Sequence, residues 1–495
     1  MSASPTVKFA LLFGIGASMA VMSIVMYFVF PVVMKSEIEK RMKIKEGSES
    51  YGYWKEPPIP IYIRFYFFNL VNPEGVWSLT EKPNFKEMGP YTFREHRVKV
   101  NLTWNDNGTV SYRQIKSWHF QPDLTNGSLD DVVTTLNVPA VAASNIYRYA
   151  PEIFYRYAID QMLNLTHSSW FVGKPVRQLL FEGYNDSLID ESRSLSPLPH
   201  EKFGWFYGKN NSDDNFYNIF TGENGINKLG QIDKWNGSEY RDIRPVIFIV
   251  VRVWESTCNK INGTTGDMWP PFRSSSDHDL TMFVTDICRS ITLKFHEETQ
   301  VKQVKAYRYL AEKTMLDNGE EDRDNRCFCL SDATRCLPRG GLNVSSCQFN
   351  APAVVTYPHF LYADPAYATT VDGMKADPEK HQMFVDIQPD MGIPMNIAAR
   401  MQINIVFERV KDMSFFQNIT SRIYFPIFWF SETAQLDESM AKQLHLVTDD
   451  LPTYSTIFCF VLFVTGGIVF TSGLLIFMRH RKIKEQKKSY KKVRT

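Results

Sequence analysis

Two long apolar segments lie near the ends of the chain, at Phe9–Met34 and Thr453–Met478. Each has 26 residues and contains no Asp, Glu, Lys or Arg. Because a helix of roughly 20 apolar residues crosses the hydrocarbon core of a bilayer, both segments predict transmembrane helices. A cleavable signal peptide is the alternative for the first segment, but its apolar region would be only about 7–15 residues long. Two spans place both termini on the same side of the membrane.

The charges beside the second segment predict which side that is. Residues 479–495 hold nine Lys or Arg against one acid, Glu485, and the positive-inside rule assigns such a tail to the cytoplasm. The first segment is less decisive, because residues 1–8 hold only Lys8 whereas five basic residues follow Met34. We expect cytoplasmic tails at 1–8 and 479–495 and an extracytoplasmic domain at 35–452. The basic tail is also expected to contact anionic lipid headgroups.

Between the spans, the hydrophobic pattern changes from strand to helix and back to strand. Residues 61–67 alternate or are aromatic, which predicts strands in the first part. From 129 to 180 apolar residues recur at steps of three and four, the period of amphipathic helices. Strand patterns return after Lys202 and include 290–295 and 401–407. Because no repeat or low-complexity linker divides the domain, we expect one α+β body.

One apolar run, Pro245–Val253, is interrupted only by Arg252. It is too short to cross a bilayer and is typical of a strand buried on both faces. A loop that dips into the membrane is the functional alternative for this run.

Asparagine sequons occur only between the two spans. Ten Asn-x-Ser/Thr sequences in this region favour a glycosylated surface in the secretory pathway. The asparagines are Asn101, Asn107, Asn126, Asn164, Asn185, Asn210, Asn236, Asn262, Asn343 and Asn418.

Six of the seven cysteines fall within residues 258–347, and an even number outside the cytosol predicts three disulfides. They are Cys258, Cys288, Cys327, Cys329, Cys336 and Cys347. Their spacing alone permits about fifteen pairings. A zinc site that uses Cys327 and Cys329 together with Cys336 and Cys347 is the sharper chemical alternative, although paired C-x-x-C sequences are missing. Cys459 lies inside the second span, where a lone thiol usually packs as a small apolar group.

Charge and motifs narrow the function classes. The chain has a net charge of +1, and the basic tail leaves a mildly acidic middle, which disfavours nucleic acid as a partner. Serine-hydrolase elbows, zinc helices, phosphate loops and EF-hand loops are missing from the sequence, so we expect neither an enzyme nor a bound metal or cofactor. His278 and His296 lie beside acids but are isolated. By layout alone the chain suits three classes: a receptor or transfer protein for extracellular ligands, an anchored enzyme, and a two-span trimeric channel whose pore the small residues of 465–473 would line. Close helix packing is the simpler explanation of that stretch.

Several segments resemble the class B scavenger receptor family, which includes fatty-acid translocase, the lysosomal integral membrane protein and the insect sensory neuron membrane proteins. They are FNLVNPEGV (68–76), EMGPYTFRE (87–95), NVPAVAAS (137–144), FTGENGINKLGQIDKWNG (220–237), DICRSI (286–291), CFC (327–329), PHFLYADP (358–365) and PIFWFSE (426–432). They run from end to end in the order of the family.

The resemblance implies an antiparallel β-barrel-like ectodomain with an apical helical bundle at about 129–180 and an internal lipid tunnel. It implies disulfides Cys258–Cys327, Cys288–Cys347 and Cys329–Cys336. Ligands would be lipids, fatty acids, sterols, carotenoids or lipoprotein particles, which are passed to the membrane through the tunnel, and a homo-oligomer fits the layout. The alternative is a phagocytic or cargo receptor without lipid transfer.

The expected ligand site lies at the apex, where the translocase branch carries lysines after the apical sequon. Here the corresponding residues are Leu165 and His167, and only a protonated His167 can pair with an acid. Nearby bases that would supply a patch are Arg148, Arg156, Lys174 and Arg177. Neither the palmitoylated cysteines of the translocase branch nor the acidic dileucine signal of the lysosomal branch occurs in the tails, so we expect the plasma membrane first and the endosome or lysosome second.

Overall fold

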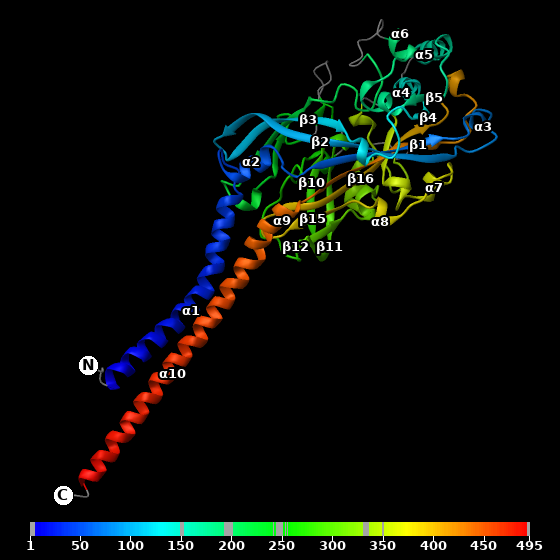
Figure 1. Cartoon of the computed structure of the whole chain (residues 1–495). Coiled ribbons are helices and arrows are strands. Elements are labelled where there is room, and N and C mark those ends of the chain that lie inside the picture. Colours follow the sequence, from blue (N-terminus) through cyan, green and yellow to red (C-terminus); the bar gives the residue numbers. More distant parts are fainter. Residues whose placement is uncertain are drawn as a thin grey trace. The chain divides into compact units, whose positions relative to one another are not determined.

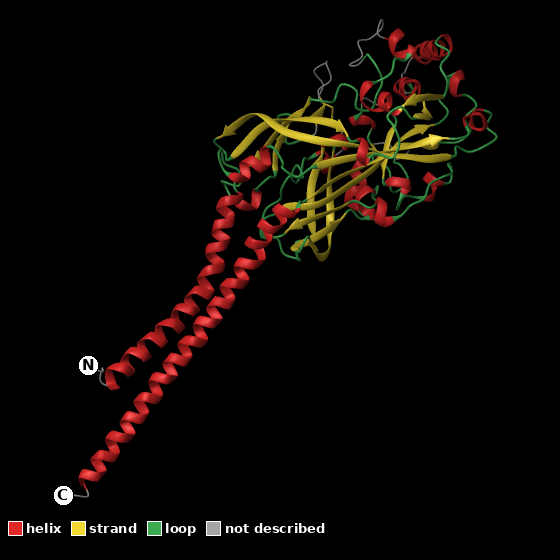
Figure 2. Ribbon diagram, in the orientation of Figure 1, coloured by secondary structure: helices red, strands yellow, loops and turns green. Residues whose placement is uncertain are grey.

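The computed structural model describes residues 5–148, 153–192, 201–240, 242–243, 251–252, 254, 256–329, 336–348 and 351–492. The chain forms two compact units (Figures 1 and 2). The membrane unit comprises Met1–Met42, Lys302–Lys305 and Glu438–Thr495. The ectodomain unit comprises Lys43–Val301 and Ala306–Asp437.

Two long helices form the membrane unit, α1 (Pro5–Met42) and α10 (Leu451–Lys492), and each contains one predicted span. They lie side by side (Figure 1), and the rings of Phe9 and Phe477 stack at 4.5 Å. A Cβ on Gly16 would lie 2.5 Å from the backbone nitrogen of Phe470, so the helices approach through bare backbone. The short helices α9 (Glu438–His445) and η12 (Leu446–Asp450) precede α10.

Small residues of the second span serve this helix contact. The backbone of Gly466 lies against Gly16, and Gly473 faces Leu12. The hydroxyl groups of Thr465 and Thr471 donate to carbonyls of their own helix. Packing therefore accounts for the small-residue stretch at 465–473.

The ectodomain is built on one antiparallel sheet of 13 strands, in the order β10-β11-β12-β15-β16-β17-β1-β2-β3-β6-β7, with β13 and β14 attached to β16 through β14. Strongly β-branched and aromatic sequences explain these strands. Their bounds are β1 (Ile61–Leu70), β2 (Phe85–Asn105), β3 (Thr109–Phe120), β6 (Ser212–Phe220), β7 (Ile232–Trp235), β10 (Asp279–Val284), β11 (Arg289–Val301), β12 (Val304–Leu310), β13 (Leu342–Asn343), β14 (Ala353–Thr356), β15 (Phe384–Gln388), β16 (Ile393–Phe407) and β17 (Ile423–Gln435).

The two edge strands of this sheet are joined through a short linking segment at residues 263–264. The backbone N–H of Ile232, in β7, donates to the Gly263 carbonyl at 2.9 Å. On the other side, the N–H of Thr264 donates to the Thr281 carbonyl of β10, and the N–H of Phe283 donates to the Thr264 carbonyl. Because residues 263–264 form hydrogen bonds with both edge strands, the sheet is barrel-like, as the resemblance implies.

The region predicted to be helical, 129–180, contains two helices between two paired strands. The strands are β4 (Val132–Leu136) and β5 (Phe171–Pro175), and the helices are α4 (Val138–Tyr147) and α5 (Ile153–Leu165). We call residues 132–175 the cap. In Figure 1 the cap lies at one end of the ectodomain sheet.

The other α-helices of the described ectodomain, and its π-helix η2, are short. They are α2 (Glu49–Lys55), α3 (Pro73–Trp77), η2 (Gln178–Glu182), α6 (Ser187–Ser192), α7 (Pro365–Ala368) and α8 (Pro378–His381). Of the predicted buried strand Pro245–Val253, the structure describes Val251–Arg252, which forms β9 and pairs with β8 (Asp242–Ile243). The rest of that prediction lies outside the described residues.

Aromatic side chains fill one face of the sheet, which we call the inner face. The ring of Phe65, fully buried in β1, contacts Phe93, Phe206 and Phe428 at 5.2–6.0 Å between centroids. Edge-to-face contacts of this kind add to the stability from apolar burial. The inner face is therefore an extended aromatic core.

Candidate functional site

The basic residues predicted at the apex lie in the cap or beside it, and three of them form ion pairs. Arg148, after α4, pairs with Glu408, and Arg156 of α5 pairs with Asp412 at 3.2 Å. Arg177 pairs with Asp130. Glu408 also pairs with Arg422 at 2.6 Å, so these arginines are engaged in ion pairs and do not form an open cationic patch.

The segment 408–416, which we call the strap, holds the cap against the sheet. Asp160, a buried residue of α5, accepts hydrogen bonds from the Ser414 hydroxyl at 2.7 Å and from the Phe415 N–H at 3.0 Å. The indole N–H of Trp170 donates to the Phe415 carbonyl at 2.9 Å. Charge-assisted bonds to a buried carboxylate fix the position of α5.

The outer face of α5 is largely apolar, with the exposed sequon residue Asn164 among its apolar side chains. Ile153, Phe154, Tyr157 and Leu165 expose 59–78% of their surface. Exposed aromatic and aliphatic residues grouped on one helix mark an interaction surface. The surface of α5 is therefore better suited to an apolar ligand than to an acidic one.

The other two predicted apex residues are His167, which follows α5, and Lys174, which lies in β5. His167 is exposed and adopts a left-handed backbone conformation, with φ 51°, in the turn after α5. Lys174 is half-buried, and its ammonium group lies 4.7 Å from the centre of the Tyr184 ring. Lys174 thus points onto an aromatic face as a cation–π pair.

The sequon asparagines lie on the ectodomain surface. All are exposed except Asn343, which is half-buried. Asn210 and Asn236 also accept backbone hydrogen bonds through their side-chain oxygens, from Trp118 and Phe216. Surface exposure is what a glycan acceptor requires, and attachment of glycans stays a prediction.

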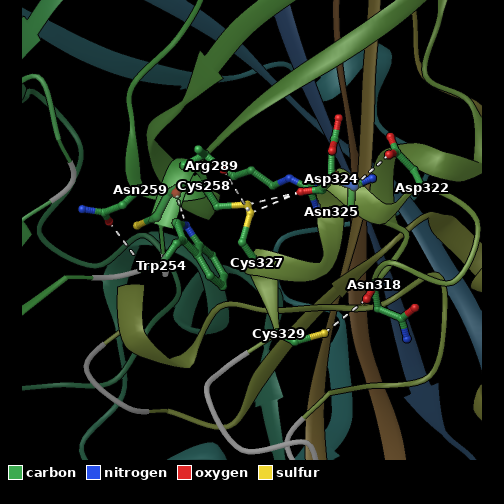
Figure 3. The surroundings of a disulfide bond; sticks show 12 residues. Trp254, Cys258, Asn259, Arg289, Asn318, Asp322, Asp324, Asn325, Cys327 and Cys329 are labelled. Atoms are coloured by element: carbon green, nitrogen blue, oxygen red, sulfur yellow. Dashed lines mark hydrogen bonds between the residues drawn. A yellow bond between two sulfur atoms is a disulfide. The ribbon is translucent and has the colours of Figure 1, made fainter.

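Three disulfides join the pairs that the resemblance implies: Cys258–Cys327, Cys288–Cys347 and Cys329–Cys336, with Cα separations of 5.7, 6.0 and 4.8 Å. Figure 3 shows the first of them between η4 (Ser256–Asn259) and η7 (Arg323–Phe328). All six cysteines are consumed in this way.

A buried arginine lies beside these disulfides. The Arg289 guanidinium donates to the Asn325 side-chain oxygen at 2.7 Å (Figure 3) and lies 3.6 Å from the centre of the Phe328 ring. Burial lowers the pKa of Arg289 to about 9. This arrangement is rigid and belongs to the disulfide region.

A cluster of charged side chains shares the inner face with the aromatic core, which sequence reasoning missed. Glu95, Arg97 and Lys99 alternate along β2 and point to one side. Arg97 pairs with both Glu95 and, at 2.6 Å, Glu432 of β17. The ammonium group of Lys99, with its side chain fully buried, lies 3.1 Å from Asp267 and donates to the Trp54 carbonyl at 2.7 Å.

The environment shifts the pKa values of this cluster. Burial lowers the pKa of Lys99, against the opposing attraction of Asp267. Burial raises the pKa of Glu432, and Arg97 only partly offsets this effect. Burial by itself would also raise the pKa values of Glu95 and Asp267. Neighbouring cations outweigh this effect, so both pKa values are lowered. The cluster contains three acids and two bases. Its members are separated by up to 337 residues in sequence, so no local motif reveals it.

Comparison with known proteins covers nearly the whole chain. Residues 14–477 match the model of the CD36 family. The chain is 33% identical over 484 residues to scavenger receptor class B member 1 of Bos taurus, which covers 96% of this chain and 89% of that protein. It is 34% identical over 449 residues to lysosome membrane protein 2 of Homo sapiens (90% and 89%), and 32% identical over 415 residues to protein peste of Drosophila melanogaster (82% and 72%). The resemblance seen in the sequence motifs is confirmed.

Proposed function

Because this chain belongs to the CD36 family, we propose that it is a class B scavenger receptor that binds lipid or lipoprotein ligands and transfers lipid to the membrane through the ectodomain. The family supports the receptor role. The transfer of lipid, the tunnel and the plasma-membrane location are our proposals. Fatty acids, sterols and carotenoids are the cargo classes.

The observation that carries ligand binding is the apolar outer face of α5. Phe154 and Leu165 are 69% and 78% exposed, so a lipid surface or an apolar particle can contact and bury them. Each fully buried side chain of this size adds about 1.5–3 kcal/mol of favourable transfer free energy. Because the nearby arginines are ion-paired, we expect apolar contacts to dominate.

The inner face supports the proposed passage. Ala399 of β16 and Phe430 and Glu432 of β17 share this face but are only half-buried, whereas their neighbours Met401 and Phe428 are buried. An inner-face side chain that keeps accessible surface adjoins open space rather than packed protein. We therefore propose that lipid passes along the inner face near Ala399.

A bulky substitution at this point tests the passage. We expect Ala399→Trp to abolish uptake of a fluorescent sterol or fatty acid by cells expressing the protein, with surface expression unchanged. Gln435→Trp, which places the same group on the exposed end of β17, is the control and should leave uptake intact. Normal uptake by Ala399→Trp would contradict the passage and favour the alternative function, a particle or cargo receptor without lipid transfer.

The membrane topology has its own test. An epitope added after Thr495 should be inaccessible to antibody on intact cells, and one inserted beside an exposed sequon such as Asn262 should be accessible. Enzymatic removal of N-glycans should lower the apparent mass of the wild type. The apparent mass should then lie close to that of a variant without sequons. Labelling mainly in permeabilised cells would favour the endosome or lysosome.

A further inference from the structure

A groove of about 370 Å³ opens on the ectodomain surface between α3 and the strand pair β4–β5. Glu74 and Trp77 of α3 form one wall. Thr134 of β4, Ser169 and Phe171 lie along the other side. This groove contains none of the residues predicted to bind ligand at the apex.

Trp77 presents a fixed aromatic surface to the groove. Its side chain is 51% exposed, and its ring rests on that of buried Trp170, with 4.5 Å between centroids. Trp170 is in turn held by its hydrogen bond to Phe415. An indole ring that is exposed yet supported from behind is preorganised to receive a ligand.

The groove also carries a negative charge that no neighbour neutralises. Glu74 lies three residues before Trp77, so both side chains are on the same side of the helix. Within the described part of the chain, the Glu74 carboxylate has no ion pair, and the groove lining contains neither Lys nor Arg. Lys174, the base of the adjoining strand, is directed to the Tyr184 ring.

We propose that this groove binds the headgroup of a choline lipid. A quaternary ammonium group is attracted to the face of an indole ring and to a carboxylate, and Trp77 and Glu74 supply both. The hydroxyl groups of Thr134 and Ser169 can donate to the lipid phosphate. This inference rests on the proposed function in one respect, namely that the ligand is a lipid.

The negative charge of the groove favours a choline headgroup over an anionic headgroup and over a neutral sugar. An anionic headgroup without an ammonium group would meet the Glu74 carboxylate with no cation to offset the repulsion. A neutral sugar could stack on Trp77, but it would leave the charge of Glu74 unused. The groove therefore favours a zwitterionic lipid whose positive end enters first.

The test uses the full-length chain in nanodiscs of phosphatidylglycerol. The probe is dihexanoyl phosphatidylcholine below its critical micelle concentration, with dihexanoyl phosphatidylglycerol as the comparison. Glu74→Gln removes the charge and keeps the shape, and Trp77→Leu removes the aromatic face. The controls are Glu223→Gln and Trp104→Leu, an exposed acid and an exposed tryptophan outside the groove.

We expect each groove variant to weaken binding of the choline probe by about fivefold or more, as loss of a cation–π or charge contact predicts, and each control to bind like the wild type. Choline-probe binding that is equal in all variants, or no tighter than phosphatidylglycerol binding, would overturn the proposal. Cellular uptake of sterol by the same variants is measured in parallel. If the wild type takes up sterol but the groove variants bind the choline probe as tightly as the wild type does, the groove proposal alone is rejected. If the wild type takes up no sterol, the proposed function is rejected.

Discussion

His359 and His381 form a buried pair, and backbone hydrogen bonds fix the orientation of both rings. Their rings stack at 4.5 Å. The Nδ1 atom of His359 accepts from the Lys375 N–H at 3.0 Å, and that of His381 accepts from the Asp377 N–H at 2.9 Å. A ring nitrogen that accepts a hydrogen bond carries no proton, so the His381 ring is neutral in this arrangement. Burial lowers the pKa of His381 to about 4.

This pair predicts a loss of stability in acid. Because the folded protein resists protonation of His381 down to about pH 4 while the unfolded chain accepts a proton below about pH 6.5, the free energy of unfolding should fall as the pH falls between these values. The loss is at most about 3 kcal/mol. His381→Gln should flatten this part of the curve in urea unfolding, whereas His278→Gln, at an exposed position, should not. Identical pH curves for His381→Gln and the wild type would contradict the assignment.

Lys99 is a fully buried base, so its removal should lower the stability of the fold. In Lys99→Met, Asp267 loses its ion-pair partner, and the cation that remains near it is the more distant Arg97. Removal of one member of a buried ion pair destabilises a protein by about 3–5 kcal/mol. We expect Lys99→Met together with Asp267→Asn to recover part of this loss. Thermal unfolding of the two proteins measures the difference. A single variant as stable as the double variant would show that the pair is not coupled.

At the scale of elements, the cap depends on the strap. Asp160 joins α5 to residues 414 and 415, so Asp160→Ala should cost about 1–3 kcal/mol because two hydrogen bonds to a buried carboxylate are lost. The loss should be local: backbone amides of residues 153–165 should exchange hydrogen faster, while those of the central sheet are unchanged. Asp190→Ala on α6 is the exposed control. Unaltered exchange in α5 would mean that the strap does not hold the cap.

The disulfides differ in the length of chain that they close. Cys258 and Cys327 are 69 residues apart, and Cys329 and Cys336 are 7 apart. In the chain-entropy model, loss of the longer loop costs about 4 kcal/mol and loss of the shorter about 2 kcal/mol. Replacing each pair by alanine and measuring the free energy of unfolding tests this order. Equal costs would point to local contacts, such as those of Arg289, rather than loop closure.

At the scale of the whole molecule, the first and last long strands of the ectodomain meet at the centre of the sheet. β1 pairs with β17, with Phe65 opposite Phe430, although 365 residues separate them. β17 also pairs with β16, so it is an interior strand. Folding of the sheet must therefore await the end of the ectodomain.

This topology predicts where the chain can be shortened. Residues 43–437, apart from 302–305, form a compact unit with its own core, so we expect the segment 43–437, secreted alone, to fold and unfold cooperatively. A chain ending at residue 422 lacks β17 and exposes both of its neighbours, and we expect it to be retained and degraded. Calorimetry and secretion assays measure both outcomes. Secretion of the shorter chain in a folded state would contradict the central role of β17.

Several features were determined by sequence because their cause is local. The two spans follow from uninterrupted apolar residues, and they appear in α1 and α10. Alternation predicted strands at 61–67 and 401–407, which lie in β1 and β16. The end-to-end motifs identified the family, and with it the pairing of six cysteines that spacing alone left open.

Tertiary structure decided what depends on contacts between distant residues. The arginines at 148 and 156 resemble an open basic patch until Glu408 and Asp412 are placed beside them. The inner-face charges and the groove at Trp77 likewise unite residues from separate strands and helices. A hydrophobic pattern reports only which face of an element is buried. Which charges meet on that face, and which surface stays open to a ligand, is decided when the sheet closes.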